Sequence, residues 1–169
     1  LASASGGFSA FQSADHDIRL WNKDGSLRAT LTGHTGTLSA LAWSPAGQTL
    51  ASSSYDGTAR LWSASGELKR TLGGKETLHN VAWSPDGTTL VTGGIIGGIA
   101  SITTPTAGCC VTLPGVVRLW RPDGTLLITL GTQYTGGKFF NLAWSPDGKL
   151  LAAGATDYRI WRADGTLLG

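Results

Sequence analysis

Residues 42–47 read AWSPAG, and nearly the same hexapeptide, AWSPDG, returns at residues 82–87 and 143–148. A second motif, Arg-Leu/Ile-Trp, ends at four tryptophans: Trp21, Trp62, Trp120 and Trp161. The first two of these tryptophans are 41 residues apart, and so are the last two. A period near 40 residues with tryptophans at fixed places indicates a protein built of internal repeats.

Each repeat divides into four short segments with the alternation of apolar and polar residues that predicts a β-strand. In the second repeat these segments are residues 38–43, 49–54, 58–62 and 67–72, named here strands a, b, c and d. Turn sequences separate them: Ser44-Pro45-Ala46-Gly47, Asp56-Gly57 and Ser65-Gly66. A single sheet of four short strands cannot bury both of its faces, so we expect the sheets to stack on one another.

This pattern resembles the WD40 family of β-propellers, and the resemblance covers nearly the whole chain. In WD40 repeats a His, a Ser or Thr, an Asp and a Trp form a buried hydrogen-bonded tetrad. The matching positions here are His34, Ser54, Asp56 and Trp62. A buried carboxylate, imidazole and indole N–H all need hydrogen-bond partners, which fits such a tetrad. The Trp-Asp dipeptide that gives the family its name is absent.

The other repeats depart from the tetrad. The first keeps Asp15 at the Asp position, but its His would precede Leu1. The third has Lys75 at the His position and Pro114 at the Asp position, and the fourth has Gln133 at the His position. We therefore expect one complete tetrad, with the other sheets held by packing.

The expected fold class is all-β, with four four-stranded antiparallel sheets of the propeller-blade type in an open or partial ring. The first sheet would lack its inner strand a, and the last would have a truncated strand d. We expect one partial propeller domain over residues 1–169 with these approximate repeats: 1–32, 33–73, 74–131 and 132–169. WD40 rings usually have seven blades, so we expect either part of a larger propeller or two copies that complete a ring; the first is favoured.

Length variation falls on two of the four kinds of connection. The a–b and c–d turns are constant, because each tryptophan of the two motifs is followed by a turn glycine four residues later. The b–c loops gain residues at about 6–13 and 94–113, and the d–a loop gains three in the last full repeat. In an up-and-down blade these two loops lie at the same end, so we expect a binding face there. Its candidate residues are Phe8, Phe11, Tyr55, Tyr134, Lys138 and Phe139.

The functional hypothesis is a non-catalytic scaffold that binds a protein or peptide on this face. The alternative is a fragment or subunit of a propeller enzyme, or a propeller that binds a small ligand or glycan at the ring mouth. No catalytic triad, phosphate-binding glycine motif or metal-ligand spacing is present, so we expect no enzyme activity and no cofactor. The net charge of +2 is too small to indicate nucleic-acid binding. The adjacent pair Cys109-Cys110 is no disulfide framework, and we expect a reducing, cytoplasmic location.

Residues 87–117 contain no charged side chain. The ends of this run match strands b and c, so only about 18 residues, near 94–113, are extra. A membrane-spanning helix needs about 20 continuous apolar residues, and this segment has too few. The insertion is either a lid or hairpin over the binding face or a disordered, non-native segment, and the sequence leaves both readings open.

Overall fold

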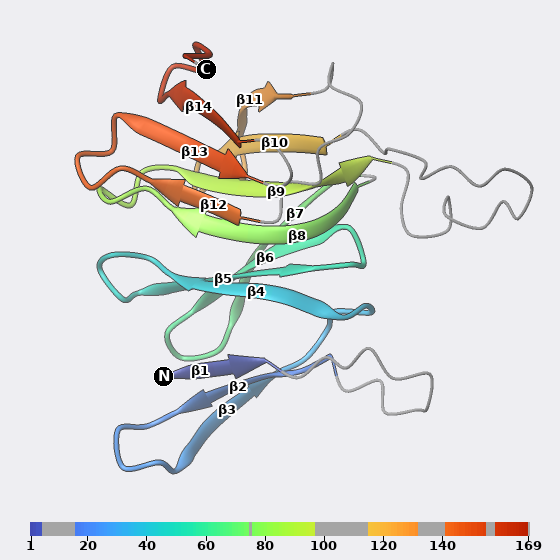
Figure 1. Ribbon diagram of the computed structural model, residues 1–169. Coiled ribbons are helices and arrows are strands. Elements are labelled where there is room, and N and C mark those ends of the chain that lie inside the picture. The colour runs from blue at the N-terminus through green and yellow to red at the C-terminus, as the bar shows by residue number, and fades with distance from the viewer. Residues whose placement is uncertain (5–15, 75, 97–114, 132–140, 155–157, 169) are drawn as a thin grey trace, which may run out of the picture.

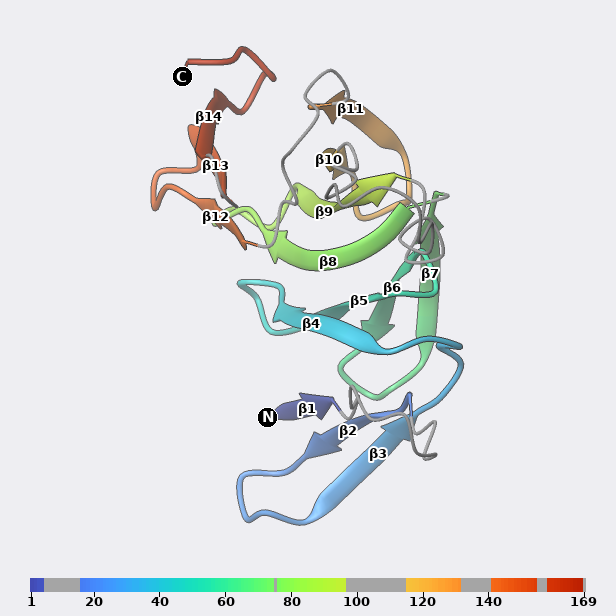
Figure 2. The same cartoon turned by 45° about the vertical axis from the view of Figure 1, so that its right-hand side comes forward.

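The structure, a computed structural model, describes residues 1–4, 16–74, 76–96, 115–131, 141–154 and 158–168. In this part of the chain, fourteen strands form four antiparallel sheets. Strands that follow one another in sequence lie side by side within each sheet, and the sheets succeed one another in chain order (Figures 1 and 2). None of the described residues belongs to a helix of the length and apolar character that a membrane crossing requires.

The strands have the following bounds. The first sheet contains β1 (Ala2–Ala4), β2 (Ile18–Trp21) and β3 (Leu27–Leu31). The second contains β4 (Leu38–Trp43), β5 (Thr49–Ser54), β6 (Thr58–Ser63) and β7 (Leu68–Gly73). The third contains β8 (Glu76–Trp83), β9 (Leu90–Ile96), β10 (Gly115–Trp120) and β11 (Leu126–Leu130). The fourth contains β12 (Asn141–Trp144), β13 (Leu150–Gly154) and β14 (Tyr158–Arg162).

This arrangement confirms the expected fold class. The first sheet has strands b, c and d but, among the described residues, no inner strand a. In the last sheet the place of strand d is marked by a single bridge between Trp161 and Leu167. The four sheets form an open array and not a closed ring (Figure 2).

Strand b of the third repeat is longer than the sequence predicts. β9 continues to Ile96, and Gly94 pairs with Val116 of β10, so residues 94–96 belong to a strand and not to the insertion. A Cβ on Gly94 would collide with the carbonyl oxygen of Thr77, so glycine permits the close approach of β8 and β9. The remainder of this insertion and the one at 6–13 lie outside the described residues, and the repeat boundaries stay a prediction.

Three hydrophobic clusters join the sheets, one between each successive pair. Leu50 and Trp62 of the second sheet pack with Ile18 and Leu20 of the first. The adjacent residues of the second sheet point the other way, because successive side chains of a strand alternate between faces. Leu61, for example, belongs to the cluster that contains Leu78, Val81 and Trp120 of the third sheet. The cluster between the third and fourth sheets repeats the pattern with Val91, Leu119, Leu151 and Trp161.

The a–b and c–d turns are fixed by short local contacts, which explains their constant length. Five aspartates accept a hydrogen bond from the backbone N–H two residues later: Asp24, Asp86, Asp123, Asp147 and Asp164. Hydrogen bonds from neighbouring Ser and Thr residues lower the pKa of each of these carboxyl groups. The turn glycine that follows each of these aspartates has a positive φ, for example 98° at Gly124. A residue with a side chain rarely adopts this conformation.

The interface between the second and third sheets predicts a large loss of stability on truncation of Leu61, which is 1% exposed. Leu61→Ala should reduce the free energy of unfolding by about 2–5 kcal/mol, because it leaves a cavity between two sheets. The matched control is Leu68→Ala on the outer strand β7, where the leucine is 47% exposed. We expect the control to cost less than about 1 kcal/mol. Urea unfolding measures both variants, and an equal loss of unfolding free energy in the two would contradict the stacked arrangement.

Candidate functional site

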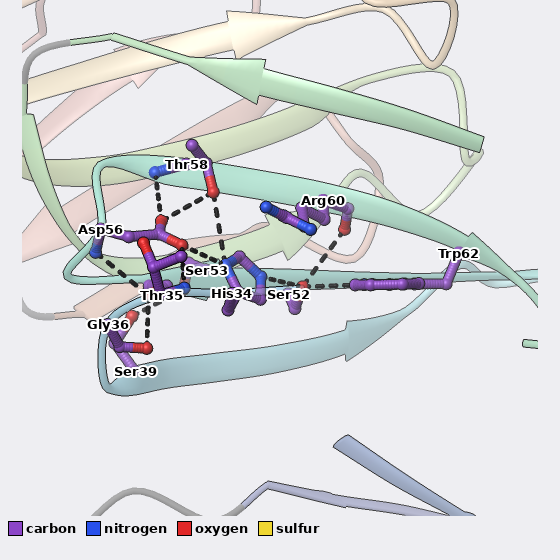
Figure 3. Close-up of polar contacts among 11 residues, drawn as sticks. His34, Thr35, Gly36, Ser39, Ser52, Ser53, Asp56, Thr58, Arg60 and Trp62 are labelled. Atoms are coloured by element: carbon purple, nitrogen blue, oxygen red, sulfur yellow. Dashed lines mark hydrogen bonds and ion pairs between the residues drawn. The ribbon is translucent and has the colours of Figure 1, made fainter. Parts of the chain in front are cut away.

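A chain of hydrogen bonds crosses the second sheet from the d–a loop to strand c (Figure 3). The His34 side chain, from the loop that joins β3 to β4, is buried, and its Nδ1 lies 2.8 Å from Oδ2 of Asp56. Its Nε2 lies 2.8 Å from Oγ of Ser52 in β5. The indole Nε1 of Trp62 in β6 donates to the same hydroxyl over 2.9 Å. The four side chains thus connect the d–a loop that carries His34 and the b–c loop that carries Asp56 to strands β5 and β6.

The serine of this chain is Ser52, which corrects the sequence prediction of Ser54. Ser54 makes different contacts: its hydroxyl donates to the carbonyl of Gly36 over 2.8 Å and accepts the N–H of Asp56 over 3.1 Å. Both serines are fully buried and, two residues apart on β5, share a face. Ser52, however, pairs with Arg60 of β6, two residues before Trp62. Ser54 lies at the end of β5, further from the indole.

A recurrence in the sequence could have identified Ser52. The equivalent residue of strand b is Ser3 in the first repeat and Thr92 in the third. The Trp21 indole donates to Ser3 Oγ over 2.9 Å, and the Trp120 indole donates to Thr92 Oγ1 over 3.0 Å. A hydroxyl therefore recurs at this position in three of the four repeats, and Ala153 replaces it in the last.

The charge of Asp56 assigns the direction of its bond with His34, and the direction of the bond between His34 and Ser52 follows for a neutral ring. An ionised carboxylate can only accept, so Nδ1 of His34 donates to Asp56. In a neutral imidazole the other nitrogen then accepts, and the Ser52 hydroxyl donates to Nε2 while its oxygen accepts from Trp62. Both ring nitrogens of His34 are thus occupied by protein groups. Ser52 is fully buried and its hydroxyl also binds the Trp62 indole, so this histidine joins the two loops to the strands in the interior of the sheet.

Asp56 is the anionic end of the chain. Burial raises the pKa of its carboxyl group, but hydrogen bonds from His34, Thr58 and the Thr35 backbone outweigh this effect and bring the pKa far below 3.8. The Thr35 N–H donates over 3.0 Å, and the N–H and hydroxyl of Thr58 donate over 2.8 and 2.7 Å. These bonds require the ionised form, so Asp56 stabilises the fold as a carboxylate.

The third sheet replaces the His–Asp pair with a different buried contact. Arg118 of β10 forms an ion pair with Glu76 at the start of β8. The Glu76 side chain is 4% exposed, and that of Arg118 is 21% exposed. A buried carboxylate needs such a partner, because an isolated buried charge is costly. This pair could not be predicted from the repeat pattern, since neither residue belongs to the recurrent tetrad.

Inner strands β4 and β8 carry equivalent β-bulges, at Ser39 and His79. A bulge turns one side chain out of the regular alternation, and bulges often lie next to functional sites. Here the hydroxyl of Ser39 lies 2.8 Å from that of Ser53. The ring of His79 meets the half-buried Tyr55 edge-on, with 5.0 Å between ring centroids. Tyr55 therefore bridges the second and third sheets beside the Asp56 loop.

The other candidate residues of the binding face lie outside the described residues: Phe8, Phe11, Tyr134, Lys138 and Phe139. Only Tyr55 of this set can be placed, and its contact with His79 links neighbouring sheets. Within the described part of the chain, no group of three or more His, Cys, Asp or Glu side chains could hold a metal ion.

Comparison with known proteins gives the same classification as the geometry. The family model described as "WD domain, G-beta repeat" matches residues 25–63, 66–95 and 129–167, together more than half of the chain. The chain belongs to the WD40 family. WD40 repeats are generally non-catalytic scaffolds for protein interaction.

One curated relative is the Nuclear distribution protein PAC1 of Tuber melanosporum (strain Mel28). It is 46% identical to this WD40 chain over 57 residues. The match covers 34% of this chain and 13% of the relative's own length. The likeness therefore concerns a short stretch of repeat sequence.

The position of Ser52 can be tested against that of Ser54. Ser52→Ala removes the acceptor of the Trp62 indole, and a buried donor without a partner costs about 1–3 kcal/mol. We expect the indole N–H resonance of Trp62 to shift in the NMR spectrum of this variant. Ser54→Ala is the matched control and should leave that resonance in place. A shift in the control alone would contradict the assignment of Ser52.

The low pKa of Asp56 predicts a pH-dependent contribution to stability. A carboxyl group with a lowered folded-state pKa stabilises the fold fully above the unfolded-state pKa of about 3.9, and this contribution is lost as the pH falls further. Asp56→Asn should therefore cost about 1.5–3 kcal/mol above pH 5, and the difference from wild type should narrow below about pH 4. Urea unfolding from pH 6 to pH 3 measures this difference. Glu67→Gln, at an exposed turn position, is the control; a constant gap for Asp56→Asn across this range would refute the prediction.

Proposed function

We propose that this protein is a non-catalytic scaffold that binds a protein or peptide on the end of the sheets that carries the b–c and d–a loops. The observation that supports it most directly is the hydrogen-bond chain from His34 to Trp62, which anchors one loop of each kind to the second sheet. A binding surface on loops needs such rigid support, because ordering mobile loops on binding weakens affinity.

Two further features favour this end over the opposite one. The a–b and c–d turns have constant length, while the b–c and d–a loops carry every insertion in the sequence. Tyr55 stands between two neighbouring sheets at the loop end. Tyrosine offers a large, amphipathic contact surface with few rotatable bonds, and it is enriched in interaction sites. Phe8, Phe11, Tyr134, Lys138 and Phe139 are proposed to belong to the same face.

The outward face of the fourth sheet is proposed to be covered by a further blade. Leu151 and Trp161 face the third sheet, so their neighbours on β13 and β14 face away from it. Leu150 is 37% exposed on that side, and Tyr158 is 79% exposed. A blade from the rest of a longer propeller is the favoured cover, and a second copy of the chain is the alternative. A cytoplasmic location, and partners other than nucleic acids and membranes, are part of the same proposal.

Site-specific photo-cross-linking tests which end of the sheets binds the partner. A photoreactive residue replaces Tyr55 at the loop end or, as the matched control, Arg121 in the c–d turn at the opposite end. We expect specific adducts from position 55, which an excess of unlabelled protein suppresses, and none from position 121. Far-UV circular dichroism checks that both variants fold. Adducts from position 121 alone, or from neither position, would contradict the proposed face.

A further inference from the structure

Arg60 and Arg118 occupy equivalent places in the second and third sheets. Each lies two residues before the tryptophan of its strand c and pairs with the hydroxyl residue of strand b. Each guanidinium also lies against a glycine of the preceding d–a loop. A Cβ on Gly33 would collide with Nη1 of Arg60, and a Cβ on Gly74 would collide with Nη1 of Arg118. The two sheets therefore build the same pairing of a guanidinium with a glycine.

In the third sheet this place is filled by a carboxylate from the chain itself. Glu76 follows Gly74 by two residues and forms an ion pair with Arg118. Its other oxygen, Oε2, also stands where a Cβ on Gly74 would be, so the carboxylate lies over the glycine backbone. The absence of a side chain at residue 74 thus leaves room for an acid beside the guanidinium.

In the second sheet the corresponding carboxylate is missing. The residue two positions after Gly33 is Thr35, which is too short to reach the guanidinium as Glu76 does and is exposed, as Gly33 is. His34, between them, is already bonded to Asp56 and Ser52. Among the described residues, no Asp or Glu lies within ion-pair distance of Arg60, which is partly exposed on β6 between Thr58 and Trp62 (Figure 3).

We propose that Arg60 and Gly33 form a receptor for an acidic side chain, Glu or Asp, of a partner protein. The partner's carboxylate would take the place that Glu76 takes beside Arg118. A guanidinium can bind a carboxylate through two parallel N–H bonds, and such charge-assisted bonds are stronger than neutral ones. The Arg60 guanidinium, from β6, lies against Gly33. This inference rests on the proposed scaffold function, because Gly33 belongs to a d–a loop of the proposed binding face. It adds the chemistry of the residue that the partner presents.

The test follows the side-chain Nε–H signals of arginine by NMR in the ¹⁵N-labelled 169-residue chain. The probe is acetyl-Gly-Gly-Glu-Gly-Gly-amide, and the matched neutral probe has Gln in place of Glu. We expect the Arg60 signal to shift saturably with the Glu peptide, with an affinity about tenfold or more above that for the Gln peptide. The Arg118 signal should not move, because Glu76 already occupies its place.

Thr35→Glu supplies the sharpest control, because it copies into the second sheet the acid of the third. Since Thr35 is exposed, the substitution should not disturb the core. The new carboxylate should fill the receptor and abolish the response of Arg60 to the Glu peptide. Arg60→Gln is the second variant, in which the backbone signal of Gly33 should no longer respond to that peptide.

Three results would overturn the receptor: no shift of the Arg60 signal, equal shifts with the Glu and Gln peptides, or an undiminished response in Thr35→Glu. If any of these occurs while cross-links still form from position 55, the acidic receptor is wrong and the proposed scaffold role stands. If cross-links at position 55 are absent while the Glu peptide binds as expected, Arg60 binds a carboxylate, but the proposed binding of a protein partner on this face is wrong.

Discussion

The Ser52 hydroxyl is the contact on which the loop end of the second sheet depends. It accepts the Trp62 N–H and lies against Nε2 of His34, whose other nitrogen binds Asp56. Removing one member leaves buried polar atoms without partners, which is more costly than the loss of a single hydrogen bond suggests. Because His34 comes from the d–a loop and Asp56 from the b–c loop, the same contact fixes both loops on one strand.

The tryptophans connect this polar chain to the stacking of the sheets. Trp62 donates to Ser52 of its own sheet, while its ring packs against the first sheet in the core. Trp120 likewise donates to Thr92 of its own sheet, and its ring belongs to the cluster between the second and third sheets. One side chain thus satisfies its polar atom within a sheet and buries its apolar surface between sheets. The regular recurrence of tryptophan follows from these two requirements, since a sheet of four short strands cannot bury both faces alone.

The sequence predicted most of the strands and their pairing order, because the turn residues and the period near 40 residues are local signals. It misassigned the serine of the tetrad, since Ser52 and Ser54 share a face; they are distinguished by the register of β5 against β6 and by the hydroxyl that recurs at Ser3 and Thr92. It also placed the insertion too early, because nothing in Gly94, Ile95 or Ile96 distinguishes a strand end from a loop. The Glu76–Arg118 ion pair depends on contacts between segments distant in sequence, which no repeat pattern reveals.

A directed chain of donors runs from Trp62 through Ser52 and His34 to Asp56, and the tautomer of His34 decides whether it exists. The ¹⁵N chemical shifts of the two ring nitrogens report which of them carries the proton. We expect a neutral imidazole with the proton on Nδ1, facing Asp56, and an unprotonated Nε2 that accepts from Ser52. A neutral imidazole protonated on Nε2 would contradict it, because Nδ1 would then have no proton to donate to the carboxylate.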